Sequence, residues 1–140
     1  MATDTPAATD ARTRVLVVDD DLASRILVAI LLEKGGYAPT AVPSVSRALE
    51  RIESEGTDVV VTDLIMPGRG GLDLLESLRE HAWHTPVIVM TGSDDEELAV
   101  RALELGAEIV LGKLYLPEEL HVAVAAALDR PTAAARTRAA

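Results

Sequence analysis

Four short hydrophobic runs restrict the fold of this chain more than any other feature of its sequence. They cover residues 15–18, 59–62, 87–90 and 109–112, and valine and isoleucine dominate them. Short β-branched runs that alternate with helical patterns are typical of parallel strands buried on both faces. The sequence therefore predicts an α/β protein whose sheet is covered by helices on both sides.

Helical patterns separate the runs. Apolar residues recur at helical spacing in the segment Leu22–Lys34, and we expect its inward face to consist of Ala23, Ile26, Leu27, Ile30 and Leu31. Further helices are expected from Ser44 to Gly56, from Leu72 to about His81, from a Ser93-x-x-Glu96 capping box to Gly106, and from Pro117 onward.

One further strand is expected near residues 37–42, and it contains Pro39. Proline cannot donate a hydrogen bond to a neighbouring strand, so this strand belongs at an edge of the sheet. Five strand–helix units with right-handed crossovers and this edge strand predict a doubly wound (βα)5 fold. Its strand order is 2-1-3-4-5, the flavodoxin-like arrangement.

Length and composition set the broad class. The chain has 140 residues, enough for one domain, and we expect a lead-in at residues 1–12, a domain at 13–130 and a tail at 131–140, both ends being disordered. Thirteen basic and twenty-three acidic residues give a formal charge of −10, which opposes binding to nucleic acid or anionic membranes. Cysteine is absent, and there is neither a secretory signal nor a membrane-length apolar stretch, so a cytoplasmic location is expected.

Polar residues stand where the predicted strands end. Asp19 and Asp20 follow the first run, Asp63 the second, Thr91 the third and Lys113 the fourth. The carboxyl ends of parallel strands form one rim of a sheet, where ligands bind. We therefore expect these five side chains to converge, although each one alone is an ordinary cap, turn or surface residue.

This set of side chains suits magnesium-assisted phosphoryl transfer. Adjacent carboxylates repel one another, and Mg²⁺, which prefers oxygen ligands, relieves that repulsion. Asp19 and Asp20 can supply ligands, while Asp63 can be both a ligand and a nucleophile that forms an aspartyl phosphate. Lys113 and the Thr91 hydroxyl can then neutralise phosphoryl oxygens.

The pair His81 and His84 is half of a metal site at most, and Trp83 between them is expected to be a partly buried anchor.

Three segments resemble the signature segments of response-regulator receiver domains of bacterial two-component signalling. They read VLVVDDD, VVVTDLIMP and GAEIVLGK. The resemblance, which covers about residues 14–130, implies that Asp63 is the phospho-acceptor and that Asp19 and Asp20 hold Mg²⁺. It also implies a metal ligand in the backbone carbonyl of Ile65, a switch hydroxyl in Thr91 and an ion-pair partner in Lys113.

The chain departs from the family pattern at three places. Leu114 follows Lys113 where proline is common, Val110 replaces the switch aromatic of the fifth strand, and Gly70-Gly71 stands where Asp-Gly is usual. Because the acids, Thr91 and Lys113 are all present, we expect the phosphoryl chemistry to be intact. The departures predict an altered signalling relay and a loosened loop after Pro67. Ile65 and Ser93 are also expected to restrict the attacking water and lengthen the phosphorylated lifetime.

The leading hypothesis is a stand-alone response regulator, and not an enzyme with its own substrate. It would accept a phosphoryl group from a histidine kinase or a histidine phosphotransfer protein, and signal by docking or by phosphorelay. The face formed by the fourth helix, fifth strand and fifth helix is the expected docking surface, on a monomer or a phosphorylation-linked dimer.

One alternative remains open, and two others fit the residues poorly. A phosphorylation-independent pseudo-receiver would act as a protein-binding module. An aspartyl phosphatase would want a second acid where Ile65 stands, and a flavin carrier would need a phosphate-cradling loop where Asp19, Asp20 and Asp21 stand.

Overall fold

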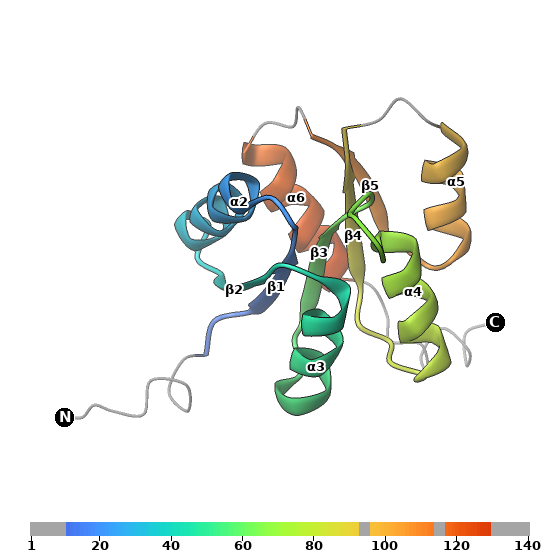
Figure 1. The fold of residues 1–140 in the computed structure, drawn as a ribbon. Coiled ribbons are helices and arrows are strands. Elements are labelled where there is room, and N and C mark those ends of the chain that lie inside the picture. Colours follow the sequence, from blue (N-terminus) through green and yellow to red (C-terminus); the bar gives the residue numbers. More distant parts are fainter. Residues whose placement is uncertain (1–10, 93–95, 114–116, 130–140) are drawn as a thin grey trace.

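The computed structural model describes residues 11–92, 96–113 and 117–129, which form alternating strands and helices (Figure 1). In chain order the elements are β1 (Arg14–Val18), α2 (Leu22–Lys34), β2 (Ala38–Val42), α3 (Val45–Glu55), β3 (Val59–Asp63), α4 (Gly71–Glu80), β4 (Val87–Thr91), α5 (Glu96–Glu104), β5 (Ile109–Gly112) and α6 (Pro117–Leu128). The expected disordered ends and the Ser93 cap lie wholly or mostly outside the described residues.

The five strands form one parallel sheet of order β2-β1-β3-β4-β5, which confirms the predicted fold. β2 is an edge strand, as Pro39 required, and its partner β1 is aligned so that Pro39 lies opposite Val15. Asp63 lies opposite Met90, and Thr91 lies opposite Gly112. This register brings the ends of β3, β4 and β5 to the same rim.

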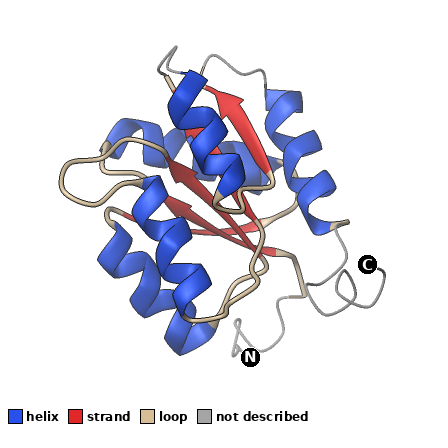
Figure 2. Cartoon of the chain, turned by 90° about the vertical axis from the view of Figure 1, so that its right-hand side faces the viewer, coloured by secondary structure: helices blue, strands red, loops and turns tan. Residues whose placement is uncertain are grey.

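Alternate strand residues face two separate cores, one on each side of the sheet. Helices cover both sides of the sheet (Figures 1 and 2). On one side Leu16, Val60 and Val89 pack beneath α3, α4 and α5. On the other side Val17 and Val61 pack beneath α2 and α6. Because both faces are buried, the strands are apolar throughout and lack the apolar–polar alternation of a half-exposed sheet.

The predicted inward face of α2 is wrong, although its bounds are right. Val28 and Leu32 are buried, whereas Ile26, Leu27 and Ile30 are 50%, 53% and 47% exposed. Apolar residues lie on nearly every side of this helix, so helical spacing alone could not select the stripe that meets the sheet. The exposed residues, together with Leu22, form what we call the α2 apolar stripe.

The positions expected for the other helices agree with the structure, and the Ser93 cap lies outside the described residues. Ser44 caps α3 by accepting a hydrogen bond from the Arg47 amide, and Pro117 is the first residue of α6. The residues of α3 and α4 that face the sheet are buried, namely Val45, Ala48 and Ile52 on α3 and Leu74, Leu75 and Leu78 on α4. In the part of the chain that the structure describes, no helix has the length and apolar character needed to cross a membrane.

Candidate functional site

Three carboxylates meet at the carboxyl rim of the sheet. Asp19 directly follows β1 and is fully buried, Asp63 ends β3 and is 6% exposed, and Asp20 is exposed to solvent. One oxygen atom from each lies within 4.8 Å of the others. Residues separated by more than forty positions thus form one acidic cluster, because the strands that carry two of them are neighbours.

Lys113 closes the cluster from the end of β5. Its Nζ lies 2.9 Å from Asp63 Oδ2, to which it donates a hydrogen bond, and 3.9 Å from Asp19 Oδ2. Burial by itself opposes the lysine charge, but the hydrogen bond and negative charge of Asp63 outweigh it, so the pKa of Lys113 is raised. Lys113 is therefore charged at neutral pH and placed to meet any anion attached to Asp63.

The two carboxylate oxygens of Asp19 differ in their hydrogen bonding. Its Oδ1 accepts a hydrogen bond from the Asp21 amide at 2.9 Å, whereas its buried Oδ2 accepts none from the described residues. Burial raises the pKa of Asp19, with smaller contributions from the charges of Asp63 and Asp20. A buried carboxylate oxygen beside two further carboxylates is the donor set that a hard divalent cation such as Mg²⁺ prefers, so the residues fit that ion.

Replacing Asp19 by asparagine is expected to stabilise the metal-free protein at neutral pH. The folded state binds the Asp19 proton more tightly than the unfolded state, so the ionised carboxylate costs stability near pH 7. We expect a gain on the order of 1 kcal/mol, or about 4 °C in Tm, by thermal unfolding in EDTA. The gain should shrink at acidic pH, where Asp19 is protonated, and added Mg²⁺ should stabilise the wild type more than the variant. A lower Tm for the variant in EDTA would contradict this account.

Thr91 and Ile65 lie at the same rim. Thr91 is the last residue of β4, and its carbonyl oxygen accepts a hydrogen bond from the Lys113 amide at 2.8 Å. Ile65 follows Asp63 by two positions and is 57% exposed. Thr91 therefore holds the backbone of Lys113 in place, and Ile65 presents an apolar side chain to solvent beside the acidic cluster.

The loop after Pro67 is tied to the site by a glycine pair. An added β carbon on Gly71 would lie 2.7 Å from the Asp63 carbonyl oxygen, and one on Gly70 would lie 2.7 Å from that of Leu64. Asp73 accepts a hydrogen bond from the Gly70 amide at 2.8 Å, and the Gly71 amide donates to Leu64. The glycines thus allow the start of α4 to pack directly on the backbone of the phospho-acceptor candidate.

Substitution of Gly71 by alanine is expected to destabilise the fold by about 1–3 kcal/mol, because the new methyl group forces the Asp63 backbone to move. Urea unfolding would measure the loss. Gly112→Ala is the matched control, since an added β carbon there meets nothing within 4 Å. Equal effects of the two substitutions would show that the close contact at Asp63 does not matter.

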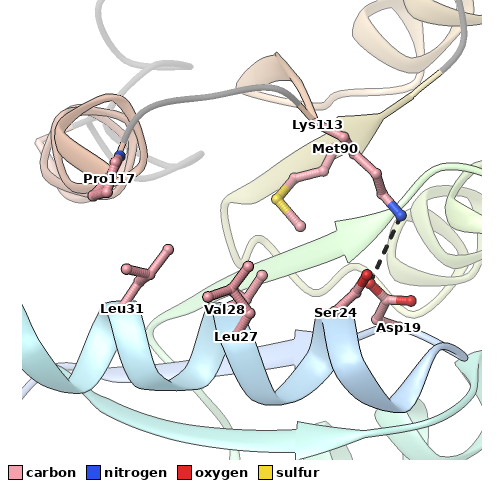
Figure 3. A pocket seen from close by; sticks show the side chains of 8 residues that line it. All are labelled: Asp19, Ser24, Leu27, Val28, Leu31, Met90, Lys113 and Pro117. Atoms are coloured by element: carbon pink, nitrogen blue, oxygen red, sulfur yellow. Dashed lines mark ion pairs between the residues drawn. The ribbon is translucent and has the colours of Figure 1, made fainter.

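A cavity of about 310 Å³ opens beside the acidic cluster, between α2 and the start of α6 (Figure 3). Leu27, Val28, Leu31, Met90 and Pro117 line its apolar part, and Asp19, Ser24 and Lys113 line the end nearest the cluster. The sequence did not predict this cavity, nor the hydrogen bond from Arg25 to the Asp19 carbonyl oxygen in the adjoining turn. No motif indicates them, because their contacts depend on how α2 is rotated against the sheet.

His81, one of the two histidines of the loop, packs on its neighbour Trp83. His81 stacks on Trp83 with ring centroids 4.3 Å apart, and its Nδ1 lies 2.8 Å from the Ser77 carbonyl oxygen. Trp83 is partly buried against the core, as expected. Within the described ranges, the cluster of Asp19, Asp20 and Asp63 is the one group of three or more possible ligands.

A 2-1-3-4-5 parallel sheet with buried acids and a lysine at its carboxyl rim defines the CheY-like class of flavodoxin-like folds. Residues 15–125 match the family described as Response regulator receiver domain, and the chain belongs to that family. Receiver domains are phospho-accepting switches that bind Mg²⁺ at this acidic cluster.

Solved structures support the assignment. A response regulator receiver domain protein from Clostridium thermocellum superposes with a TM-score of 0.79 at 30% identity, covering 84% of this chain and 95% of that one. A CheY-like receiver domain protein from Methanospirillum hungatei superposes with a TM-score of 0.79 at 28% identity, covering 85% and 95%.

Curated relatives are longer than this chain. The transcriptional regulatory protein FixJ of Azorhizobium caulinodans is 42% identical over 116 residues, which are 83% of this chain and 55% of that protein. The alkaline phosphatase synthesis transcriptional regulatory protein PhoP of Bacillus subtilis is 33% identical over 122 residues, which are 87% of this chain and 51% of that protein. The chain spans about half the length of these relatives. Their names describe transcriptional regulators, so the expected lack of nucleic-acid binding stays a prediction here.

Proposed function

We propose that this chain accepts a phosphoryl group on Asp63 from a histidine kinase or a histidine phosphotransfer protein, and signals through a change in protein docking or by phosphorelay. The observation that carries the proposal is the contact between Asp63 Oδ2 and Lys113 Nζ at 2.9 Å, inside a cluster of three carboxylates. A buried carboxylate held against a lysine is both a nucleophile and half of a phosphoryl-binding site.

The chemistry assigns a separate task to each side chain. A carboxylate oxygen of Asp63 forms the new O–P bond while the N–P bond of the phosphohistidine breaks, and the imidazole leaves with the electron pair of that bond. Lys113 turns from Asp63 to an oxygen of the transferred group, and the Thr91 hydroxyl donates to another. Asp19, Asp20, Asp63 and the Ile65 carbonyl would hold Mg²⁺, which when bound offsets the negative charge that gathers at the site.

The α2 apolar stripe lies on the approach to this site. It begins at Leu22, which is 60% exposed and is three residues from Asp19. Phosphoryl transfer between proteins brings a donor side chain to Asp63, so the donor must cover part of the surrounding surface. Exposed aliphatic side chains next to the rim supply apolar area for that contact.

For the output surface we propose the face made by α5, β5 and α6. It exposes Val100 and Leu103 on α5 and Val122 on α6. Val110 packs partly buried against the core beneath α5, where an aliphatic side chain has no ring to rotate. Phosphorylation would therefore reach this face through Lys113, which follows β5, and Thr91, which ends β4, and not through an aromatic switch residue. Both a downstream protein and a second copy remain candidates for docking there.

Acetyl phosphate tests the proposed function without knowledge of the natural kinase. Intact-mass spectrometry after incubation is expected to show one added phosphoryl group per chain that requires Mg²⁺. Absence of the adduct under these conditions, with correct folding, would count against the proposal and favour the pseudo-receiver alternative. Partner binding of equal affinity with and without phosphorylation would also favour the pseudo-receiver alternative.

Substitution of Ile65 by asparagine is expected to shorten the lifetime of the phosphorylated protein several-fold. An amide beside Asp63 can orient the water that attacks the acyl phosphate, whereas the exposed isoleucine cannot. Loss of the adduct is followed by mass spectrometry after removal of the donor. Leu103→Asn on α5, another half-exposed aliphatic position, is the control. A lifetime as long as that of the wild type would refute a role for Ile65 in excluding water.

A further inference from the structure

The turn from β1 to α2 is held by a series of hydrogen bonds around Asp19. The Asp21 amide donates to Asp19 Oδ1 at 2.9 Å, and the Ser24 amide donates to Asp21 Oδ2 at 2.8 Å. A third bond comes from the side chain of Arg25, whose Nη1 donates to the Asp19 carbonyl oxygen at 2.7 Å. Arg25 thus joins α2 to the last buried residue before the turn.

These bonds determine where the available oxygen of Asp19 points. The backbone of Asp19 is fixed on one side by its amide, which donates to the Val42 carbonyl oxygen at 3.2 Å, and on the other by Arg25. With Oδ1 engaged by the turn, Oδ2 is left near Lys113 and the other carboxylates. A change in the Asp19 backbone would therefore move the oxygen that faces the cluster.

We propose that Arg25 is a positioning residue of the metal site, and that it holds Asp19 in the orientation needed for Mg²⁺ while making no contact with the ion itself. The inference rests on the Mg²⁺ dependence in the proposed function and names a residue on which that dependence relies. Partners that orient a metal ligand typically change metal affinity 10–100-fold when they are removed.

The two physical effects of Arg25 on cation binding have opposite signs, which makes the proposal testable. Its positive charge lies beside the acidic turn, because its side chain is bonded to the Asp19 carbonyl oxygen. By charge alone, removal of Arg25 would strengthen the binding of a divalent cation. By positioning, removal would weaken it, and the structure favours the weaker binding because the 2.7 Å bond meets the backbone of a ligand residue.

Titration calorimetry of Mg²⁺ into the metal-free, unphosphorylated full chain distinguishes these effects. Arg25→Gln, which removes the charge and shortens the side chain, is expected to weaken Mg²⁺ binding about tenfold or more. Arg25→Lys retains the charge with a single donor group, and its Mg²⁺ affinity is expected to lie between those of Arg25→Gln and the wild type. The Tm of each protein in EDTA shows whether the fold is kept.

Arg14 supplies a matched control at the opposite end of β1. Its Nη1 also donates to a backbone carbonyl, that of Glu55 at 2.9 Å, and its side chain is half exposed. Arg14→Gln is expected to leave Mg²⁺ affinity unchanged, even if it lowers Tm as much as Arg25→Gln does.

Equal or tighter Mg²⁺ binding by folded Arg25→Gln would overturn the proposal, as would a matching loss in Arg14→Gln. If Arg25→Gln does not fold, Arg25→Lys decides by the same criterion. A different result would contradict the proposed function alone: a wild type that binds Mg²⁺ but takes no phosphoryl group from acetyl phosphate. A wild type that binds no Mg²⁺ would overturn both.

Discussion

Asp63→Asn is expected to abolish phosphoryl incorporation while the protein stays folded. An amide oxygen lacks the charge and nucleophilicity of a carboxylate, so the O–P bond cannot form. The variant should keep its stability or gain some, because it removes one of three carboxylates whose oxygens lie within 4.8 Å. Intact-mass spectrometry with acetyl phosphate and Mg²⁺ measures incorporation, and circular dichroism during heating measures folding.

Asp58→Asn is the appropriate control for this variant. Asp58 is an exposed aspartate that accepts a hydrogen bond from the Arg14 amide at 2.8 Å, at the amino end of the sheet. Its substitution should leave the adduct at the level of the wild type. An adduct that persists in Asp63→Asn would place the phospho-acceptor elsewhere and remove the basis of the proposed mechanism.

Lys113→Gln is expected to change two properties in opposite directions. Phosphoryl transfer from acetyl phosphate should slow by roughly 10²–10³, the usual cost of removing one group that stabilises charge in a transition state. Mg²⁺ binding should become tighter, because Lys113 lies 2.9 Å from Asp63 Oδ2 and competes with the ion for the cluster. Single-turnover kinetics at saturating Mg²⁺ and calorimetric titration measure the two effects separately.

Lys34→Gln provides the comparison, since it removes one positive charge in the exposed last turn of α2. It should affect neither the transfer rate nor Mg²⁺ binding beyond a small change from net charge. If Lys113→Gln lowered both the rate and the Mg²⁺ affinity, the lysine would serve mainly to hold the site together. Such a result would contradict a direct role in meeting the phosphoryl group.

Most of the fold was predictable because it depends on patterns that are local in sequence. Short valine-rich runs that alternate with helical patterns are typical of strands buried on both faces, and Pro39 favours an edge strand, so the order β2-β1-β3-β4-β5 followed with right-handed crossovers. The convergence of Asp19, Asp63 and Lys113 was predictable for the same reason, since parallel strands end at a common rim.

The rotation of α2 was not predictable from the sequence. Its apolar residues surround the helix, so their spacing fits several inward faces about equally well. Packing against the sheet and α6 selected Val28 and Leu32, and left Ile26 and Ile30 exposed. The same packing places Leu27 and Leu31 along the cavity beside Lys113.

The sequence by itself determined the sheet, its order and the acids and lysine gathered at one end, because strand periodicity and strand ends are encoded locally. Only the tertiary structure decided that α2 presents an apolar stripe to solvent, that Gly71 lies against the Asp63 carbonyl, and that Arg25 reaches the backbone of Asp19. These features depend on how whole elements pack, and packing is set by the combined shape of residues distant in sequence.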